Sequence, residues 1–139
     1  MHSGLARSAS LAGHGAEPHH AERLVRSFGA AFAGLAFVAQ TQLNWRIHCV
    51  LGTAAVAAAL ALGFSPIEWA VLALTVGGIL ALEAVNTAIE ATVDALPGPH
   101  SEDKRHAKDA AAAAVLMGAF AALGVGAALF GPRILSLRP

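Results

Sequence analysis

The sequence predicts an all-α membrane protein, in which an N-terminal amphipathic surface helix precedes three transmembrane helices. Hydrophobic residues make up 56% of the 139 residues and charged residues only 13%, whereas soluble globular domains contain about 45–50% and about 25%. The mean hydropathy is +0.60, and the apolar residues form long runs separated by short polar connectors. Helices of about 20 apolar residues cross the hydrocarbon core of a bilayer, so these runs predict membrane spans.

The composition also excludes several classes of function. The formal net charge is zero, so no positive field indicates nucleic acid as a partner. The single cysteine, Cys49, excludes an intramolecular disulfide and has the apolar neighbours of a buried thiol. The sequence has no His/Cys spacing typical of zinc ligands and no phosphate-binding P-loop motif.

The first 20 residues are rich in Gly, Ser, Ala and His and have no sustained apolar period. We expect residues 1–20 to form a disordered cytoplasmic tail. No apolar stretch of signal-peptide length follows Arg7. The histidines at 14, 19 and 20 are interpreted as part of this solvated tail rather than as a metal site.

The amphipathic helix is predicted over about residues 22–42. Phe28, Phe32 and Leu35 are spaced at i, i+4 and i+7 and therefore share one helix face. This pattern is typical of a helix that lies on the membrane surface. Arg23 and Arg26, on the same helix, suit either anionic lipid headgroups or a triphosphate, and residue chemistry leaves both open.

Three membrane spans are predicted after it, over about residues 45–64, 66–92 and 108–130. The first ends at Gly63 and Ser65, and Pro66 follows at a position that favours a new helix start. A polar loop at 97–106 separates the second span from the third, which is uncharged from 110 to 130. Residues 133–139 are expected to form a short C-terminal tail.

The third span carries small residues at every fourth position, Gly118, Ala122 and Gly126. Such a seam suits close contact between helices in a membrane. Basic residues predict the orientation, because cytoplasmic flanks are enriched in Lys and Arg. The predicted cytoplasmic side has Arg7, Arg23, Arg26, Arg46, Lys104, Arg105 and Lys108, and the other side has Arg133 and Arg138.

The second span ends in a polar stripe. Glu83, Asn86, Glu90 and Asp94 lie at i, i+3, i+7 and i+11, within about 80° of one another around a helix. A carboxylate at membrane depth costs at least about 2.5–3.5 kcal/mol, and intramembrane ionisable residues are functional by default. We therefore expect either cations and protein donors, or a metal ion, to face the stripe. For Asp94 a position at the headgroup boundary is an equal alternative.

Acidic and basic residues thus converge at one membrane face, where they suit a metal-bound polyanion together with a lipid headgroup. Two other functions also fit intramembrane acids, namely an ion or proton carrier and a catalytically inactive scaffold. The position of the acids argues against a carrier, since they cluster at one end of the bundle and the third span has no polar residue to extend a path.

The stripe lies in the run EAVNTAIEATVD, from Glu83 to Asp94, and Lys108-Asp109 follows fourteen residues after Asp94. Together with the connector NWRIH at 44–48 and the two arginines of the surface helix, this pattern resembles the prokaryotic diacylglycerol kinase family, which includes undecaprenol kinases. The resemblance covers about residues 23–130. It implies a surface helix and three transmembrane helices in a homotrimer of the bacterial cytoplasmic membrane, with the active site on the cytoplasmic side.

The resemblance implies transfer of the γ-phosphate of ATP-Mg to a lipid hydroxyl, either of undecaprenol or of diacylglycerol. By resemblance Glu83 matches the general base, Glu90 a magnesium ligand and Asn86 a polar partner within the site. The residues expected to contact the nucleotide are Arg23, Arg26, Gln42, Glu90, Asp94, Lys108 and Asp109, and Trp45 and Arg46 are expected to shape the substrate site.

The chain departs from the family pattern at three places. Gln42 stands where many members have a second metal-binding carboxylate, so it supplies an uncharged ligand for magnesium. The segment 99–101, Pro-His-Ser, replaces the usual Glu-Tyr-His contact to the nucleotide, and Ala30 replaces an aromatic residue of some members. These changes predict loose recognition of the nucleotide base.

Overall fold

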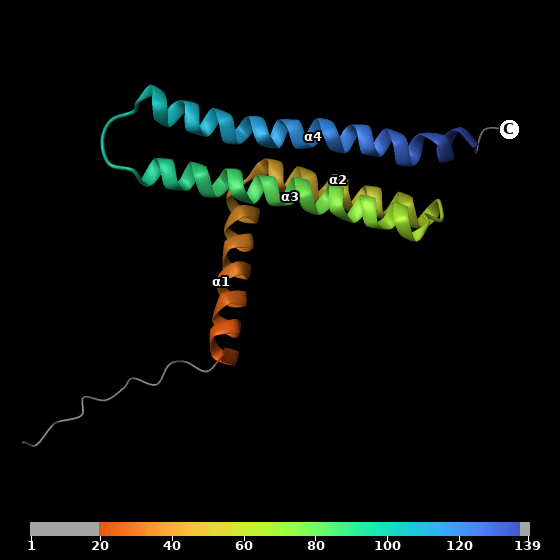
Figure 1. Ribbon diagram of the computed structural model, residues 1–139, viewed down its shortest axis with the longest axis horizontal. Helices are drawn as coiled ribbons and strands as arrows, with labels where there is room; N and C mark the ends of the chain where they lie inside the picture. Colours follow the sequence, from red (N-terminus) through yellow and green to blue (C-terminus); the bar gives the residue numbers. More distant parts are fainter. Residues whose placement is uncertain (1–19, 137–139) are drawn as a thin grey trace, which may run out of the picture. The chain divides into compact units, whose positions relative to one another are not determined.

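The computed structural model describes residues 20–136, and all regular secondary structure within this range is α-helical. The four helices are α1 (His20–Thr41), α2 (Leu43–Ala61), α3 (Pro66–Ala95) and α4 (Glu102–Ser136) (Figure 1). The predicted all-α membrane class is confirmed, since all four are long and apolar enough to cross a bilayer. This includes α1, so its position on the membrane surface stays a prediction. The tail expected at 1–20 lies, except for His20, outside the described residues.

The chain divides into two compact units, one ending at Phe32 and the other beginning at Ala33. In the described part of the first unit, the apolar side chains Leu24, Phe28 and Phe32 are exposed over 59–67% of their surface. The hydroxyl of Ser27 donates to the carbonyl of Arg23 within this helix. The described part of this unit is therefore a helical segment with apolar side chains on its surface.

In the second unit, α2 and α4 both pack against α3, and α4 runs back along α3 after the connecting loop (Figure 1). Two glycines allow the close approach. A Cβ atom on Gly52 of α2 would lie 2.9 Å from the side chain of Val76, and one on Gly118 of α4 would lie 2.6 Å from Leu82. Of the small-residue seam predicted on the third span, Gly118 therefore packs inside the chain itself.

The turn between α2 and α3 is built by local hydrogen bonds. The amide of Phe64 donates to the carbonyl of Ala59, and Gly63 has a φ of +65°, the left-handed conformation that glycine adopts at helix C-termini without steric cost. At the start of α3, the amide and the hydroxyl of Ser65 both donate to Oε2 of Glu68. Pro66 occupies the first helical position, so the predicted helix start at 66 agrees with the structure.

Arg133, near the end of α4, forms hydrogen bonds that stabilise this turn. Its guanidinium donates to both carboxylate oxygens of Glu68, at 3.1 and 2.6 Å, and to the carbonyls of Leu62 and Gly63. It also lies 4.9 Å above the ring of Phe64. The helix therefore continues to Ser136, beyond the predicted end at 130, because its last turn has tertiary partners.

α4 also begins earlier than the predicted start at 108. The amide of Lys104 donates to the hydroxyl of Ser101, at 3.3 Å, and Glu102 and Asp103 occupy the first turn. A serine cap and acidic residues stabilise a helix N-terminus. Part of the predicted polar loop is therefore helix, and only residues 96–101 connect α3 to α4.

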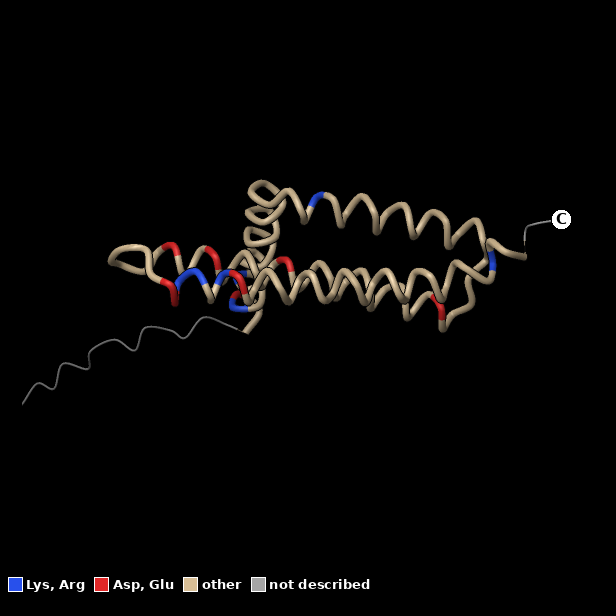
Figure 2. Tube along the Cα trace, turned by 90° about the horizontal axis from the view of Figure 1, so that it is seen from above, with Lys and Arg blue, Asp and Glu red and all other residues tan. Residues whose placement is uncertain are grey.

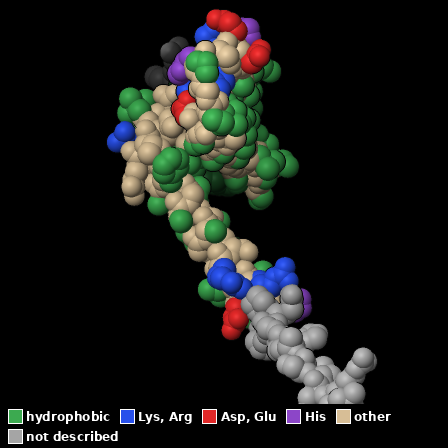
Figure 3. Space-filling view, turned by 90° about the vertical axis from the view of Figure 1, so that its left-hand side faces the viewer, with side chains coloured by type: hydrophobic (Ala, Val, Ile, Leu, Met, Phe, Trp, Pro, Cys, Tyr) green, Lys and Arg blue, Asp and Glu red, His purple; other side chains and the backbone are tan. Residues whose placement is uncertain are grey.

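The bundle is covered by apolar side chains rather than filled by them. Many large apolar residues are exposed, among them Leu74, Met117 and Leu123 at 69–77%. Apolar side chains, drawn green, are also visible on the face of the bundle shown in Figure 3. A membrane protein is expected to show this pattern, because lipid replaces water around it. The largest fully buried side chain is a carboxylate, Glu83, which is 1% exposed.

Candidate active site

Charged residues of α3 and α4 gather towards the loop that joins these helices, and long stretches of both helices beyond it are uncharged (Figure 2). Three of the four stripe residues, Glu83, Asn86 and Glu90, lie in the second half of α3 and are buried or half-buried. Asp94 is exposed in the last turn of the same helix. The 3.6-residue period of the helix places all four on one face, as the sequence predicts.

The first cluster in the site joins Gln42, Asn86 and Glu90. The amide nitrogen of Asn86 donates to Oε1 of Glu90, at 3.2 Å, and the amide nitrogen of Gln42 donates to Oε2, at 3.4 Å. Gln42 is the residue that separates α1 from α2. Its backbone is extended rather than helical, and its side chain reaches α3. The structure thus brings together three of the predicted site residues.

This cluster fits a magnesium ion. Among residues 20–136, no three His, Cys, Asp or Glu side chains are placed so that they could hold a metal ion together. Magnesium, however, needs only one or two carboxylates beside water and phosphate oxygens. Glu90 supplies a carboxylate and the two amides supply carbonyl oxygens. Oδ1 of Asn86 is buried and has no hydrogen-bond partner in the described chain, which leaves an oxygen available as a ligand.

The second cluster is the pair Glu83 and His48. Nε2 of His48, on α2, lies 3.4 Å from Oε1 of Glu83. This is an ion-pair distance, but the atoms lack hydrogen-bond geometry, and Oε1 has no hydrogen-bond partner in the described part of the chain. The carboxylate predicted to act as the base is therefore buried and faces one ionisable side chain of a neighbouring helix.

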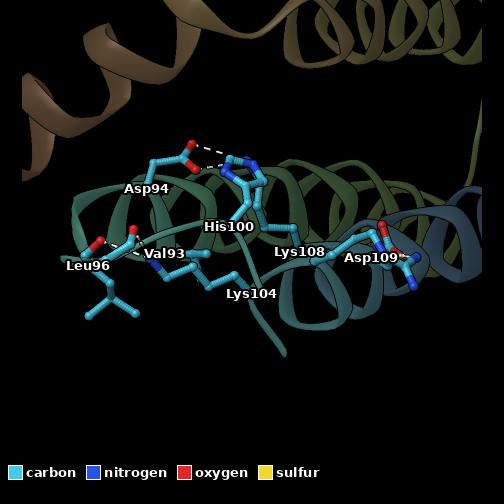
Figure 4. A pocket seen from close by; sticks show the side chains of 9 residues that line it. Val93, Asp94, Leu96, His100, Lys104, Lys108 and Asp109 are labelled. Atoms are coloured by element: carbon cyan, nitrogen blue, oxygen red, sulfur yellow. Dashed lines mark hydrogen bonds and ion pairs between the residues drawn. The ribbon is translucent and has the colours of Figure 1, made fainter. Parts of the chain in front are cut away.

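A pocket of about 340 Å³ lies where α3 ends and α4 begins (Figure 4). Lys108 donates to both carboxylate oxygens of Asp94, at 3.0 and 3.1 Å. Arg105 donates to Oδ2 of Asp109, at 2.9 Å. The pocket is lined by the polar residues Asp94, His100, Lys104, Arg105, Lys108 and Asp109, and by Val93, Leu96 and Gly98. Three predicted nucleotide contacts, Asp94, Lys108 and Asp109, therefore share one pocket.

Lys104 lines the same pocket but is already engaged. Its ammonium group donates to the carbonyls of Leu96, Pro97 and Gly98, at 3.0 to 3.3 Å. These carbonyls follow the C-terminus of α3, where a positive charge is stabilising. Lys104 thus holds the loop in place, while the ammonium group of Lys108 binds, among residues 20–136, only the carboxylate of Asp94.

Four further site residues were predicted, namely Arg23, Arg26, Trp45 and Arg46. Arg23 and Arg26 belong to the first unit, and their predicted role towards a nucleotide stays a prediction. Trp45 and Arg46 lie in the first turn of α2, half-buried and exposed respectively, and their predicted role in shaping the substrate site also stays a prediction.

Sequence reasoning missed two features of the site. The sequence analysis assigns His48 no role beyond the NWRIH connector, and the signal for one is an ionisable side chain directly before the apolar run that begins at Cys49. The loop contacts of Lys104 were also missed, and a lysine shortly after a helix end is the signal that indicates them.

Comparison with known proteins gives consistent matches. The family described as "Prokaryotic diacylglycerol kinase" matches residues 29–130. A protein named "Diacylglycerol kinase" from Synechocystis sp. is 45% identical over 118 residues, which are 84% of this chain and 67% of the relative. A protein named "Undecaprenol kinase" from Bacillus subtilis is 36% identical over 112 residues, which are 81% of this chain and 91% of the relative. The matched range contains both clusters and the pocket.

Proposed function

The chain belongs to the prokaryotic diacylglycerol kinase family and is a membrane lipid kinase; from this premise we propose that it transfers the γ-phosphate of ATP to a hydroxyl of undecaprenol or diacylglycerol. The observation that carries the proposal is the order of groups along α3. A buried carboxylate, Glu83, is followed by the Gln42–Asn86–Glu90 cluster and then by the pocket at Asp94 and Lys108.

This order suits phosphoryl transfer between a lipid and a nucleotide. Glu83 lies about 10 Å deeper along the helix than Glu90, at 1.5 Å per residue over seven residues. A lipid hydroxyl approaches from the hydrocarbon, whereas a triphosphate approaches from water. Each reactant therefore meets its own end of the stripe, and the phosphate is transferred between them.

Each residue then has a definite task. Lys108 neutralises phosphate oxygens, and Asp94 and Asp109 hold the basic side chains of the pocket, Lys108 and Arg105, in position. Glu90, Gln42 and Asn86 would hold Mg²⁺, and the ion would supply charge neutralisation on the phosphates. Glu83 is the final acceptor of the proton that leaves the lipid hydroxyl. Phosphoryl transfer needs positioning and electrostatic stabilisation more than covalent chemistry, so these tasks suffice.

The proposed setting is the bacterial cytoplasmic membrane, with the site on the cytoplasmic side and the chain assembled as a homotrimer. The basic residues near the stripe support this orientation.

A direct assay tests the proposal. The purified full chain in detergent–lipid micelles is given γ-labelled ATP and MgCl₂, with diacylglycerol or undecaprenol offered separately. Labelled lipid phosphate with one of the two lipids is the expected result, and it also decides between them. A Glu90→Gln protein controls for contaminating kinases. No labelled lipid from either substrate, with the protein folded and assembled, overturns the proposal.

A further inference from the structure

His48 lines a second cavity, an apolar groove with a volume of about 370 Å³. Its floor is α3, and its walls are α2 and α4, which both pack against α3. Among the described residues that line the groove, His48 is the only ionisable one. The hydroxyl of Thr75, also in the lining, donates to the carbonyl of Val71 in its own helix. His48 is therefore the polar group that an apolar molecule in this groove meets.

The groove runs from the acidic end of the bundle towards the opposite end. Along α4 its lining extends from Ala119 to Phe130, a distance of about 16 Å for eleven residues at 1.5 Å per residue. Phe130 packs against Phe64 with ring centroids 4.9 Å apart, and Arg133 lies over Phe64. The far end of the groove is therefore flanked by aromatic side chains. The ionisable side chain of the lining, His48, lies at the other end.

Glu83 is not among the residues that line this groove. Its carboxylate is 1% exposed, and Nε2 of His48 lies 3.4 Å from Oε1. A hydroxyl carried by a lipid chain in the groove thus reaches the imidazole before it reaches the carboxylate. A distance of this size is compatible with catalysis, since catalytic hydrogen bonds are often long before substrate binds.

We propose that His48 is a catalytic residue that contacts the lipid hydroxyl and stands between it and Glu83. This inference rests on the proposed lipid kinase function. As the lipid oxygen forms its bond to the γ-phosphorus and the bond from phosphorus to the ADP oxygen breaks, the hydroxyl proton moves to Nδ1 of His48. The proton on Nε2 faces Glu83, whose carboxylate stabilises the imidazolium and finally receives that proton.

The arrangement accounts for two observations together. The burial of Glu83 keeps its carboxylate away from the anionic γ-phosphate, which would repel it. The pair also gives a use to Oε1 of Glu83, which is otherwise a buried acceptor without a hydrogen bond in the described chain. Buried polar atoms are normally paired, so this exception requires an explanation.

Lipid kinase assays on the full chain test the inference with His48→Ala, His48→Gln and, as matched control, His106→Ala. His106 is an exposed histidine of α4. We expect the His48 variants to lose about 10²–10⁴-fold in kcat, the range of general base catalysis, with little change in the KM for ATP. Added imidazole should restore part of the activity of His48→Ala, which a merely structural residue would not allow. His106→Ala should retain wild-type kcat.

A double mutant gives an independent readout. Residues that act as a unit have non-additive effects, so His48→Gln combined with Glu83→Gln should be no slower than the slower single variant. Multiplied losses, kcat within about twofold of wild type for His48→Gln, or failure of imidazole to restore any activity in a folded His48→Ala protein would each overturn the role of His48. A wild-type protein that labels no lipid refutes instead the proposed function.

Discussion

The amide nitrogen of Gln42 donates to Oε2 of Glu90 across 48 residues of sequence, at 3.4 Å. This contact places an uncharged side chain beside the carboxylate that is proposed to bind magnesium. If both positions carried carboxylates, the two groups would repel each other in the absence of a cation. A bound cation would remove this repulsion by contacting both.

Replacing Gln42 with Glu should therefore preserve or increase lipid kinase activity at low magnesium. The thermal stability of the variant should fall when magnesium is removed and recover when it is added. Gln40→Glu, an exposed position in α1, introduces the same charge away from Glu90 and should change neither quantity. An assembled Gln42→Glu protein without activity at any magnesium concentration would contradict the metal assignment.

Glu83→Gln removes proton acceptance but keeps side-chain size and hydrogen-bonding capacity. We expect a folded protein that binds ATP with nearly wild-type affinity and has a kcat lower by about 10²–10⁴-fold. Single-turnover assays and equilibrium nucleotide binding separate the two effects. Turnover near the wild-type rate would refute the base assignment, and loss of ATP binding would move Glu83 to the metal site.

Lys108 and Lys104 line one pocket but should differ in their effects when each is changed to Gln. Among the described residues, the ammonium group of Lys108 binds only the Asp94 carboxylate. Lys108→Gln should therefore raise the KM for ATP by about tenfold or more, since a hydrogen bond to a charged group contributes about 1.5–3 kcal/mol. Lys104 holds three loop carbonyls, so its loss should mainly lower the unfolding temperature. Reversed effects in steady-state kinetics and thermal melts would refute the division of tasks.

Arg133 should stabilise the end of the bundle opposite to Glu83. The side chains of Arg133 and Glu68 are only 30% and 21% exposed, and their two-point contact is of the strong kind. Arg133→Lys cannot reproduce that contact together with the two carbonyl contacts, and should lower the unfolding temperature in micelles. Activity at low temperature should remain, because the substitution is distant from the site. Unchanged thermal melts in micelles would show that the contact is not stabilising.

The predicted orientation places the turn between α2 and α3 outside the cytoplasm. Ser65 itself caps α3, so a better reporter is Ile67→Cys, 72% exposed in the first turn of the helix, in a Cys49→Ser background. A membrane-impermeant maleimide should label this cysteine in intact cells, and Asp103→Cys, at the start of α4, only after lysis. The opposite pattern would reverse the orientation.

The sequence by itself determined the features that depend on one helix at a time. Long apolar runs predict the spans because the bilayer sets their length. The stripe from Glu83 to Asp94 follows from the helical period. The start of α3 at Pro66 follows from local capping chemistry. Helix ends that depend on tertiary contacts were predicted less well, as the extension of α4 to Ser136 through Arg133 illustrates.

Only the tertiary structure decided which residues of other helices face the stripe. Helical periodicity specifies a face of each helix but not its rotation or its register against a neighbour. Those depend on where backbones approach closely, here at Gly52 between α2 and α3 and at Gly118 between α3 and α4. That packing places His48 beside Glu83. The non-helical residue between α1 and α2, Gln42, comes to lie beside Glu90. These contacts join positions 35 and 48 residues apart, and no local pattern in the sequence encodes them.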